Sequence, residues 1–332
     1  MKRIAPALIL ALLVPACGLG QAAGLSNDSP DIGQAGPTTT AGSVVAPSTT
    51  QETPPHATEA AGPSPTTTSG SPAASTVSST PTQPATMHVA PYFFVDEAGR
   101  HNRTGPFLVP VAREVPSSVA VARRAMEQLL AGPTQQEREA VPALSSAIPA
   151  GVELLGLTIE KGTAQVDLSS EFEIGDDSAA VPARVAQVVF TLTRFDSVER
   201  VRFLQEGKEV KTPTSDGGLV DGAVTRGDYL DFAAAISTES PSYGAIASDP
   251  LRVTGFAAVF EATFQYALTD ADGLIIEEGV AMTSNGMGWG TFDFTIDYEV
   301  ERRQRGALIV WAHSAKDGSR IDIREYPVTL HP

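Results

Sequence analysis

The 332-residue chain contains a single cysteine, Cys17, and its thiol is the first group whose chemistry needs an explanation. A lone thiol cannot close an intramolecular disulfide, nor supply the repeated thiolates of a structural zinc or iron–sulfur site. A catalytic cysteine needs a folded pocket with a base beside it. The surrounding residues, "LLVPACGLG", are small or apolar. Cys17 is therefore expected to be an attachment point or an inert side chain.

The residues before Cys17 favour attachment. Lys2 and Arg3 are followed by the apolar run "IAPALILALLV", which is typical of a secretory signal peptide and too short to span a bilayer comfortably. The stretch that ends at Cys17 resembles the lipobox of bacterial lipoproteins. This resemblance implies that residues 1–16 are removed and that a diacylglyceryl group anchors the extracytoplasmic protein to the cell membrane at Cys17. The alternative is an ordinary cleaved signal that happens to contain a cysteine.

Adjacent carboxylates are the next candidates for chemistry. Glu277-Glu278 and Asp176-Asp177 could act as general acid and base, as paired carboxylates do in glycoside hydrolysis. In a chain with a net charge of −16, however, adjacent acids are usually solvated surface residues. No catalytic residue is therefore expected.

Metal and cofactor sites are not expected either. The stretch "TDADG" could begin a calcium loop, but with Gly273 as the sixth position Leu268 and Gly279 occupy the first and twelfth positions, where carboxylates are needed. A hairpin turn is the favoured interpretation. The five histidines lack the spacing of a metal-binding pair. The acidic charge without a cationic block argues against nucleic acid and against electrostatic binding to anionic lipid.

Composition divides the chain into an unfolded and a folded part. Residues 17–88 are rich in Ser, Thr and Pro and can bury almost nothing, so they are expected to form a lipidated N-terminus and a disordered linker. The remaining residues, about 240, are enough for two domains.

The first domain, residues 89–212, combines helical and strand periodicities. Apolar spacing predicts two helices, and Thr134 with Glu137 has the spacing of a capping box. Alternation on either side of "EKGT" predicts a hairpin with Gly162 in its turn. The predicted fold is α+β, a small sheet with two covering helices. The residue ranges expected to be strands or helices are 89–95, 106–115, 117–132, 155–168, 179–195 and 197–210.

The second domain, residues 248–331, follows an expected linker at 213–247 and has the period of strands throughout. In "AVFEATFQYALT", alternation predicts one strand that buries Phe260, Phe264 and Leu268 on the same face. About seven such strands, separated by Gly- and Asn-containing turns, predict an all-β sandwich.

Both domains resemble known families. "LVPVAREV", "AMEQLLAGPT", "IPAGVELLGLTIEKGTAQVDLSSEF" and "VVFTLTRFDSVERVRFLQEG" resemble, in that order, the GerMN domain of sporulation and spore germination proteins. "VTGFAAVFEATFQYALTDADG", "GTFDFTI" and "SAKDGS" resemble the immunoglobulin-like domain of bacterial spore germination. The first resemblance implies a non-enzymatic extracytoplasmic module, similar to ring-building motifs, with no catalytic residues to carry over.

The expected function is therefore that of a non-catalytic cell-envelope lipoprotein. It would present interaction or assembly domains to envelope proteins or to further copies of itself, in envelope assembly or a process similar to sporulation or germination. Two alternatives remain open. A cell-wall polymer-binding module would use exposed aromatic side chains, for which Trp289 and Tyr298 are the candidates, although Tyr298 is placed equally well in the core. A hydrolase would use acidic residues.

Overall fold

The computed structural model describes residues 85–96, 105–141, 143–174 and 180–332. The lipidation candidate Cys17, the expected signal peptide, nearly all of the expected linker and Asp176-Asp177 lie outside these residues. Within the described residues, no helix is long and apolar enough to cross a membrane.

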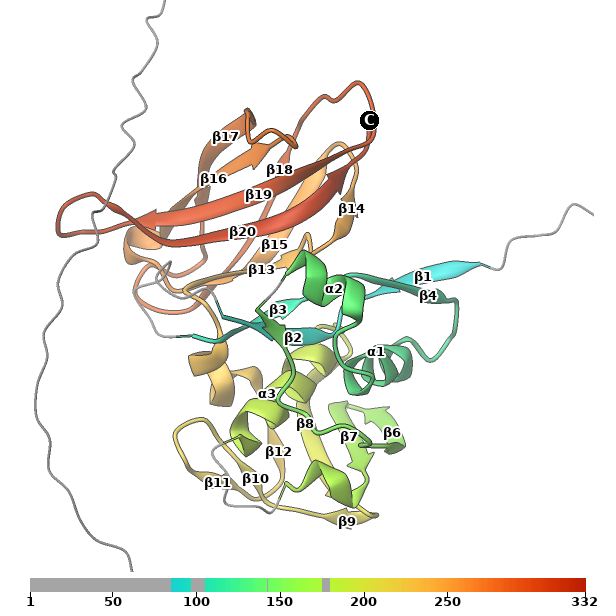
Figure 1. Cartoon of the computed structure of the whole chain (residues 1–332). Coiled ribbons are helices and arrows are strands. Elements are labelled where there is room, and N and C mark those ends of the chain that lie inside the picture. The colour runs from blue at the N-terminus through green and yellow to red at the C-terminus, as the bar shows by residue number, and fades with distance from the viewer. Residues whose placement is uncertain (1–84, 97–104, 142, 175–179) are drawn as a thin grey trace, which may run out of the picture. The chain divides into compact units, whose positions relative to one another are not determined.

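The N-terminal module combines short strands with helices, as the α+β prediction requires (Figure 1). Its largest sheet has the order β12-β8-β7-β6, with β9 added to β8, and a smaller sheet has the order β3-β2-β5. Its elements are β1 (Thr86–Val89), β2 (Tyr92–Val95), β3 (Phe107–Pro110), β4 (Arg113–Pro116), α1 (Val121–Leu130), α2 (Gln135–Ala140), β5 (Leu144–Ser145), β6 (Leu154–Glu160), β7 (Gly162–Leu168), η1 (Ser170–Phe172), α3 (Val181–Leu192), β8 (Val198–Gln205), β9 (Lys208–Glu209), β10 (Thr212–Pro213), β11 (Leu219–Val220), β12 (Ala223–Val224) and η2 (Arg226–Phe232).

Local sequence accounts for the central part of this module. The predicted hairpin forms between β6 and β7, and its turn places Lys161 and Gly162 at φ values of 49° and 77°. Strand β7 pairs in parallel with β8, and α3 makes the crossover between them. Most side chains of α3 are buried, because the helix packs against α1, β2 and β8. This burial explains why α3 is apolar around most of its circumference.

The first apolar run, expected to be one strand, is divided at Pro91. Strand β1 ends at Val89 and pairs with β4, whereas β2 begins at Tyr92 and pairs with β3 and β5. Proline lacks the N–H needed inside a ladder, so the chain changes partners there. The paired strands β1 and β4 consequently form a separate ribbon, visible at the right of Figure 1.

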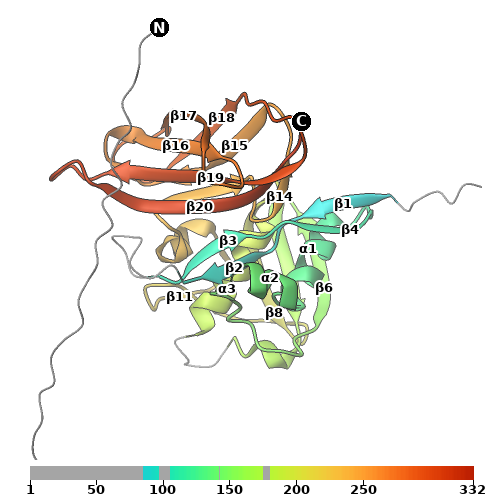
Figure 2. The ribbon, with the colours of Figure 1, turned by 45° about the horizontal axis from the view of Figure 1, so that its top comes forward.

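The C-terminal module is a sandwich of two sheets, as predicted. One sheet has the order β13-β15-β18, and the other has the order β14-β20-β19-β16-β17, with β14 parallel to β20 (Figure 2). Its elements are β13 (Ile236–Ser240), β14 (Ala245–Ala247), β15 (Leu251–Ala257), η3 (Phe260–Ala262), β16 (Thr263–Thr269), β17 (Ile275–Met282), β18 (Gly290–Ile296), β19 (Gln304–His313) and β20 (Arg320–Leu330).

The strand predicted to begin at residue 258 begins only at Thr263. Glu261 and Ala262 both adopt φ 57°, a left-handed conformation that interrupts the ladder. Phe264 and Leu268 are buried as predicted, but Phe260 is 66% exposed. The expectation that Phe260 joins the core is therefore wrong, because its backbone lies outside the alternating strand.

Residues 213–247, expected to be a linker, contain short strands and η2. Tyr229 is fully buried and its hydroxyl donates to the carbonyl oxygen of Pro213, at 2.8 Å. Ala233 and Ile236 are also buried, in the same hydrophobic cluster as residues of both modules. The Gly and Asp content of this segment suggested a linker, but its few apolar side chains anchor it in the core.

Candidate interaction site at the junction of the two modules

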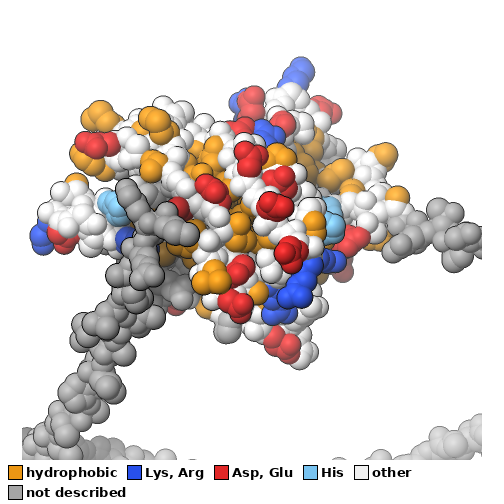
Figure 3. All heavy atoms as spheres, turned by 90° about the horizontal axis from the view of Figure 1, so that it is seen from above, with side chains coloured by type: hydrophobic (Ala, Val, Ile, Leu, Met, Phe, Trp, Pro, Cys, Tyr) orange, Lys and Arg blue, Asp and Glu red, His pale blue; other side chains and the backbone are white. Residues whose placement is uncertain are grey.

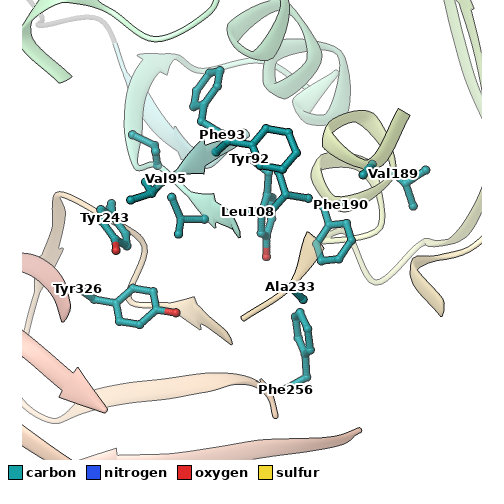
Figure 4. Packing of buried hydrophobic residues seen from close by; sticks show 14 of the residues in the cluster. Tyr92, Phe93, Val95, Leu108, Val189, Phe190, Ala233, Tyr243, Phe256 and Tyr326 are labelled. Atoms are coloured by element: carbon teal, nitrogen blue, oxygen red, sulfur yellow. The ribbon is translucent and has the colours of Figure 1, made fainter. Parts of the chain in front are cut away.

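The two modules meet through aromatic side chains. Phe190 on α3 lies between Tyr92 on β2 and Phe256 on β15, with ring-centre distances of 5.4 and 6.1 Å (Figure 4). Nearby, the rings of Tyr243 and Tyr326 meet edge to face at 5.2 Å. Such contacts add to the free energy gained by burying apolar area. One continuous core therefore extends from the α+β module into the sandwich.

Backbone hydrogen bonds reinforce this contact. The Tyr243 N–H donates to the carbonyl oxygen of Pro110, and the Ala112 N–H donates to that of Tyr243, both at 2.9 Å. Within the sandwich, the Tyr326 hydroxyl accepts from the Thr238 N–H at 2.8 Å and so connects its two sheets beside the junction. Directional bonds of this kind fix the relative orientation of the surfaces that they join.

A cluster of charged side chains lies beside the aromatic contact. A guanidinium nitrogen of Arg226 lies 2.7 Å from Glu239 Oε1, and the Tyr92 hydroxyl donates to the same oxygen at 3.1 Å. Arg226 Nε donates to Thr193 Oγ1 at 2.9 Å. Arg194 donates to the main-chain carbonyl oxygen of Glu239 at 2.7 Å. Residues far apart in the chain thus share one hydrogen-bond network.

The network favours the protonated forms of Tyr92 and Arg226. Burial, together with the Glu239 charge, raises the pKa of the Tyr92 hydroxyl, so the phenol keeps its proton and can donate it to Glu239. Burial opposes the charge of Arg226, but interactions with Tyr92 and Glu239 outweigh it and raise the pKa of the guanidinium. The protonated Tyr92 hydroxyl and the charged Arg226 guanidinium therefore both direct hydrogen toward Glu239 and join the modules through it.

A groove of about 470 Å³ opens next to the junction, between α2, β4 and the turn before β14. Residues of both modules line it, including Arg113, Glu137 and Tyr243. Arg113 bonds both Glu137 carboxylate oxygens, at 2.7 and 2.6 Å, and also donates to the carbonyl oxygens of Gln128 and Gly132. Its guanidinium is thus occupied by internal partners, so Arg113 shapes the groove wall.

The predicted capping box is confirmed. Thr134 Oγ1 accepts from the Glu137 N–H at 3.2 Å, and Glu137 Oε2 accepts from the Thr134 N–H at 2.7 Å. Burial disfavours the Glu137 carboxylate, but hydrogen bonds from Arg113 and Thr134 together outweigh burial and lower the pKa of Glu137 below its ordinary value of 4.5.

Glu137→Gln should therefore destabilise the protein in a pH-dependent manner. Because the pKa of Glu137 is lower in the folded state than in the unfolded state, its ionised carboxylate stabilises the fold at pH values above the unfolded-state pKa. This contribution is lost as the pH falls through the folded-state pKa. At pH 7 we expect a loss of about 2 kcal/mol in the free energy of unfolding, measured by urea denaturation. Below pH 4.5 the difference from the native chain should shrink.

The matched control is Glu139→Gln, because Glu139 lies on the same helix with an exposed side chain. This substitution should change the free energy of unfolding by less than about 0.5 kcal/mol. A Glu137→Gln penalty that stays constant from pH 7 to pH 3 would contradict the role of the ionised carboxylate.

The two aromatic candidates for wall-polymer contact occupy different environments. Tyr298 is buried, and its hydroxyl lies 2.9 Å from the carbonyl oxygens of both Ala247 and His331. The structure thus places Tyr298 in the core, one of the two positions left open by the sequence. Trp289 is half-buried and packs against Phe256, with 5.5 Å between ring centres. Only part of the indole of Trp289 faces solvent.

Of the acidic candidates, Glu277 and Glu278 lie within the described residues. Glu277 and Glu278 are exposed on β17. Across the described ranges, no three His, Cys, Asp or Glu side chains group closely enough to hold a metal ion. The "TDADG" stretch forms a turn in which the Gly273 N–H donates to the carbonyl oxygen of Asp270, and Asp270 Oδ1 accepts from the N–H groups of Asp272 and Leu274.

Sequence reasoning missed the charged residues of the junction. A signal for Arg113 was present, because alternation in "VPVAREV" places Arg113 on the same strand face as Val111 and Val115, both of which are buried. A charge in such a position indicates a buried ion pair. Arg226 and Glu239 gave no comparable signal, since their neighbours are polar or small.

Family models match both modules. Residues 91–211 match Germane, described as sporulation and spore germination, and residues 235–319 match Gmad2, the immunoglobulin-like domain of bacterial spore germination. The expected GerMN and immunoglobulin-like domains are therefore confirmed. None of the curated proteins compared with the chain matches it.

Three solved structures are similar to parts of the chain. The first GerMN domain of the sporulation protein GerM from Bacillus subtilis is 23% identical and has a TM-score of 0.34, with 43% of this chain and 99% of that chain covered. The tandem GerMN domains of the same protein are 19% identical, with a TM-score of 0.36 and coverage of 65% and 63%. A putative lipoprotein from Clostridium perfringens is 18% identical, with a TM-score of 0.28 and coverage of 43% and 89%.

Proposed function

We propose that this protein, which carries a sporulation and spore germination domain followed by an immunoglobulin-like domain of bacterial spore germination, is a non-catalytic lipoprotein of the cell envelope. Its two modules form a single binding body, held near the membrane by lipid at Cys17. In a sporulation- or germination-like process, this body binds other envelope proteins or further copies of itself.

The observation that carries the proposal is the continuous core at the junction. Aromatic contacts, main-chain hydrogen bonds and the Arg226–Glu239 pair all join the two modules. Modules joined by a hydrophobic contact with buried polar bonds keep a fixed relative orientation, unlike domains on a flexible tether. A rigid body of this kind suits the presentation of a composite surface to a protein partner.

Cys17→Ala should move the protein out of the membrane fraction while leaving both modules folded. A diacylglyceryl group supplies two acyl chains, which are enough for stable anchoring, whereas the chain without lipid has no cationic patch to hold it at the bilayer. The measurement is fractionation of cells followed by immunoblotting, with circular dichroism of the purified variant as the folding check. Unchanged fractionation of Cys17→Ala would contradict lipid attachment.

The proposed sporulation- or germination-like process is tested by comparing cells that make the native chain, cells that make the Cys17→Ala variant and cells in which the gene is deleted. We expect the deletion to impair sporulation, germination or envelope integrity, and Cys17→Ala to share this defect despite normal folding. A deletion that leaves all three unchanged would contradict the proposed process. Full function of the Cys17→Ala variant would show that binding does not require the anchor.

A further inference from the structure

Strand β17 is the terminal strand of its five-stranded sheet, and among the described residues it pairs only with β16. The register is interrupted near Ile276, but Glu277–Met282 pairs with β16 without a break. Alternate N–H and C=O groups of a terminal strand point away from its sheet. Along its regular part, β17 can therefore accept another extended chain. The strand at the opposite end of the sheet, β14, has only three residues.

The outer face of β17 is largely apolar, and it also carries the exposed carboxylate of Glu278. Ile275, Val280 and Met282 are 58%, 63% and 68% exposed, whereas Ala281, between the last two, is buried. Phe260 lies nearby in sequence before β16, and its neighbour Ala262 accepts a hydrogen bond from the Thr283 N–H that follows β17. Edge strands are usually protected by charged side chains, proline, a bulge or a covering segment. Strand β17 contains no lysine or proline, and its charges are the two carboxylates of Glu277 and Glu278, which would repel an acidic partner but attract a basic one.

A hollow of about 550 Å³ lies beside the start of β17, between this strand and the segment that follows β18. Its lining includes the carboxylates of Asp249, Glu277, Asp297 and Glu299. Asp249 accepts the main-chain N–H of Tyr298, at 2.8 Å. Within the described part of the chain, none of the four carboxylates forms an ion pair. In Figure 3, acidic side chains are interspersed with hydrophobic ones on the face that includes this module.

We propose that the β17 edge binds an extended segment of another envelope protein, in which basic and apolar side chains alternate. The inference rests on the proposed function and identifies the chemistry of its partner. The segment would add a strand to the sheet through main-chain hydrogen bonds. Its apolar side chains would cover Val280 and Met282, and its lysine or arginine side chains would reach the carboxylates around Glu277.

Charge favours this occupant over a second copy of the chain. Two β17 strands placed side by side would bring Glu277 and Glu278 of each copy close to those of the other, and like charges across a strand pair are destabilising. The net charge of −16 adds repulsion between copies. A basic segment, in contrast, gains from the same charges.

The test measures binding of a fluorescent peptide that alternates lysine and valine to the full chain carrying Cys17→Ala. We expect saturable binding by fluorescence anisotropy that weakens as salt rises. Methylation of alternate peptide nitrogens should abolish binding, because a strand needs those N–H groups. Equal binding of the methylated peptide would overturn the proposal, as would the absence of saturable binding below about 1 mM.

Two charge reversals provide a matched comparison. Glu277→Lys, at the β17 edge, should raise the dissociation constant by about tenfold or more, whereas Glu160→Lys, an exposed position on the edge strand β6, should leave it unchanged. Equal effects of both substitutions would overturn the assignment to β17. Sedimentation could instead show that the chain forms dimers and that Val280→Lys dissociates them. This result would assign the β17 edge to a second copy and would also overturn the proposal. Loss of peptide binding has no bearing on the fractionation of Cys17→Ala, so the two proposals fail separately.

Discussion

Arg226→Ala should lower the free energy of unfolding by about 3 kcal/mol and should weaken both modules together. The substitution removes the guanidinium together with its contacts to Glu239, to Thr193 and to the carbonyl oxygen of Phe190. The substitution also removes the cation–π contacts with Phe190 and Phe256, whose ring centres lie 5.0 and 5.4 Å from the central guanidinium carbon.

The loss is large because the Glu239 carboxylate would be left without its ion-pair partner at a partly buried site. Arg226 and Glu239 have side-chain exposures of only 20% and 26%. Removing one partner of a buried ion pair costs far more than the pair contributes, because the remaining charge is desolvated without compensation. For a body of this size, the melting temperature should fall by about 10 °C.

Differential scanning calorimetry provides the measurement, with Arg252→Ala as the matched control. Arg252 pairs with Asp293 at 2.6 Å, but both side chains are more than half exposed, so its removal should have little effect on the free energy of unfolding. The native chain and both variants should melt in one transition. Two separate transitions in the native chain, or equal losses from the two arginine substitutions, would contradict the role given to the junction.

Gly255→Ala should destabilise the sandwich by about 3 kcal/mol, because β15 lies between two partner strands at this position. Gly255 pairs with Thr238 on one side and Phe292 on the other. An added Cβ would overlap the Ser237 carbonyl oxygen and lie 2.5 Å from Phe292 Cζ. Backbone on one side and a buried ring on the other leave no direction in which the methyl group can be accommodated.

Chemical denaturation of the purified variants measures this effect. Gly288→Ala is the control, since an added Cβ there would have Asn285 Nδ2, at 3.5 Å, as its nearest neighbour. That substitution should change stability by no more than about 0.5 kcal/mol. A Gly255→Ala protein as stable as the Gly288→Ala protein would show that β13 and β18 can separate at little cost.

Local patterns in the sequence predicted the elements that are stabilised by residues close to one another in the sequence. The β6–β7 hairpin and the Thr134–Glu137 capping box depend on residues a few positions apart, and both form as predicted. The left-handed pair Glu261 and Ala262 escaped prediction because neither is glycine, so no local signal marks the end of the ladder.

The junction could not be predicted from spacing. Tyr92 and Glu239 are 147 positions apart, and their hydrogen bond depends on the folding of both modules. Tyr92 and Phe190 lie in segments predicted to be a strand and a helix, but periodicity does not say which module covers them. The Tyr298 position was ambiguous for a related reason, because its strand-like periodicity continues beyond the end of β18.

The continuous core limits how the chain can be shortened to one module or recombined with another protein. A fragment ending near residue 232 would leave Phe190 without Phe256, and one starting there would leave Phe256 without Phe190. Recombination that exchanged one module alone would therefore have to supply a matching apolar surface at the same time. The two modules are expected to persist together as a pair, with substitutions at Phe190 and Phe256 compensating each other across the boundary.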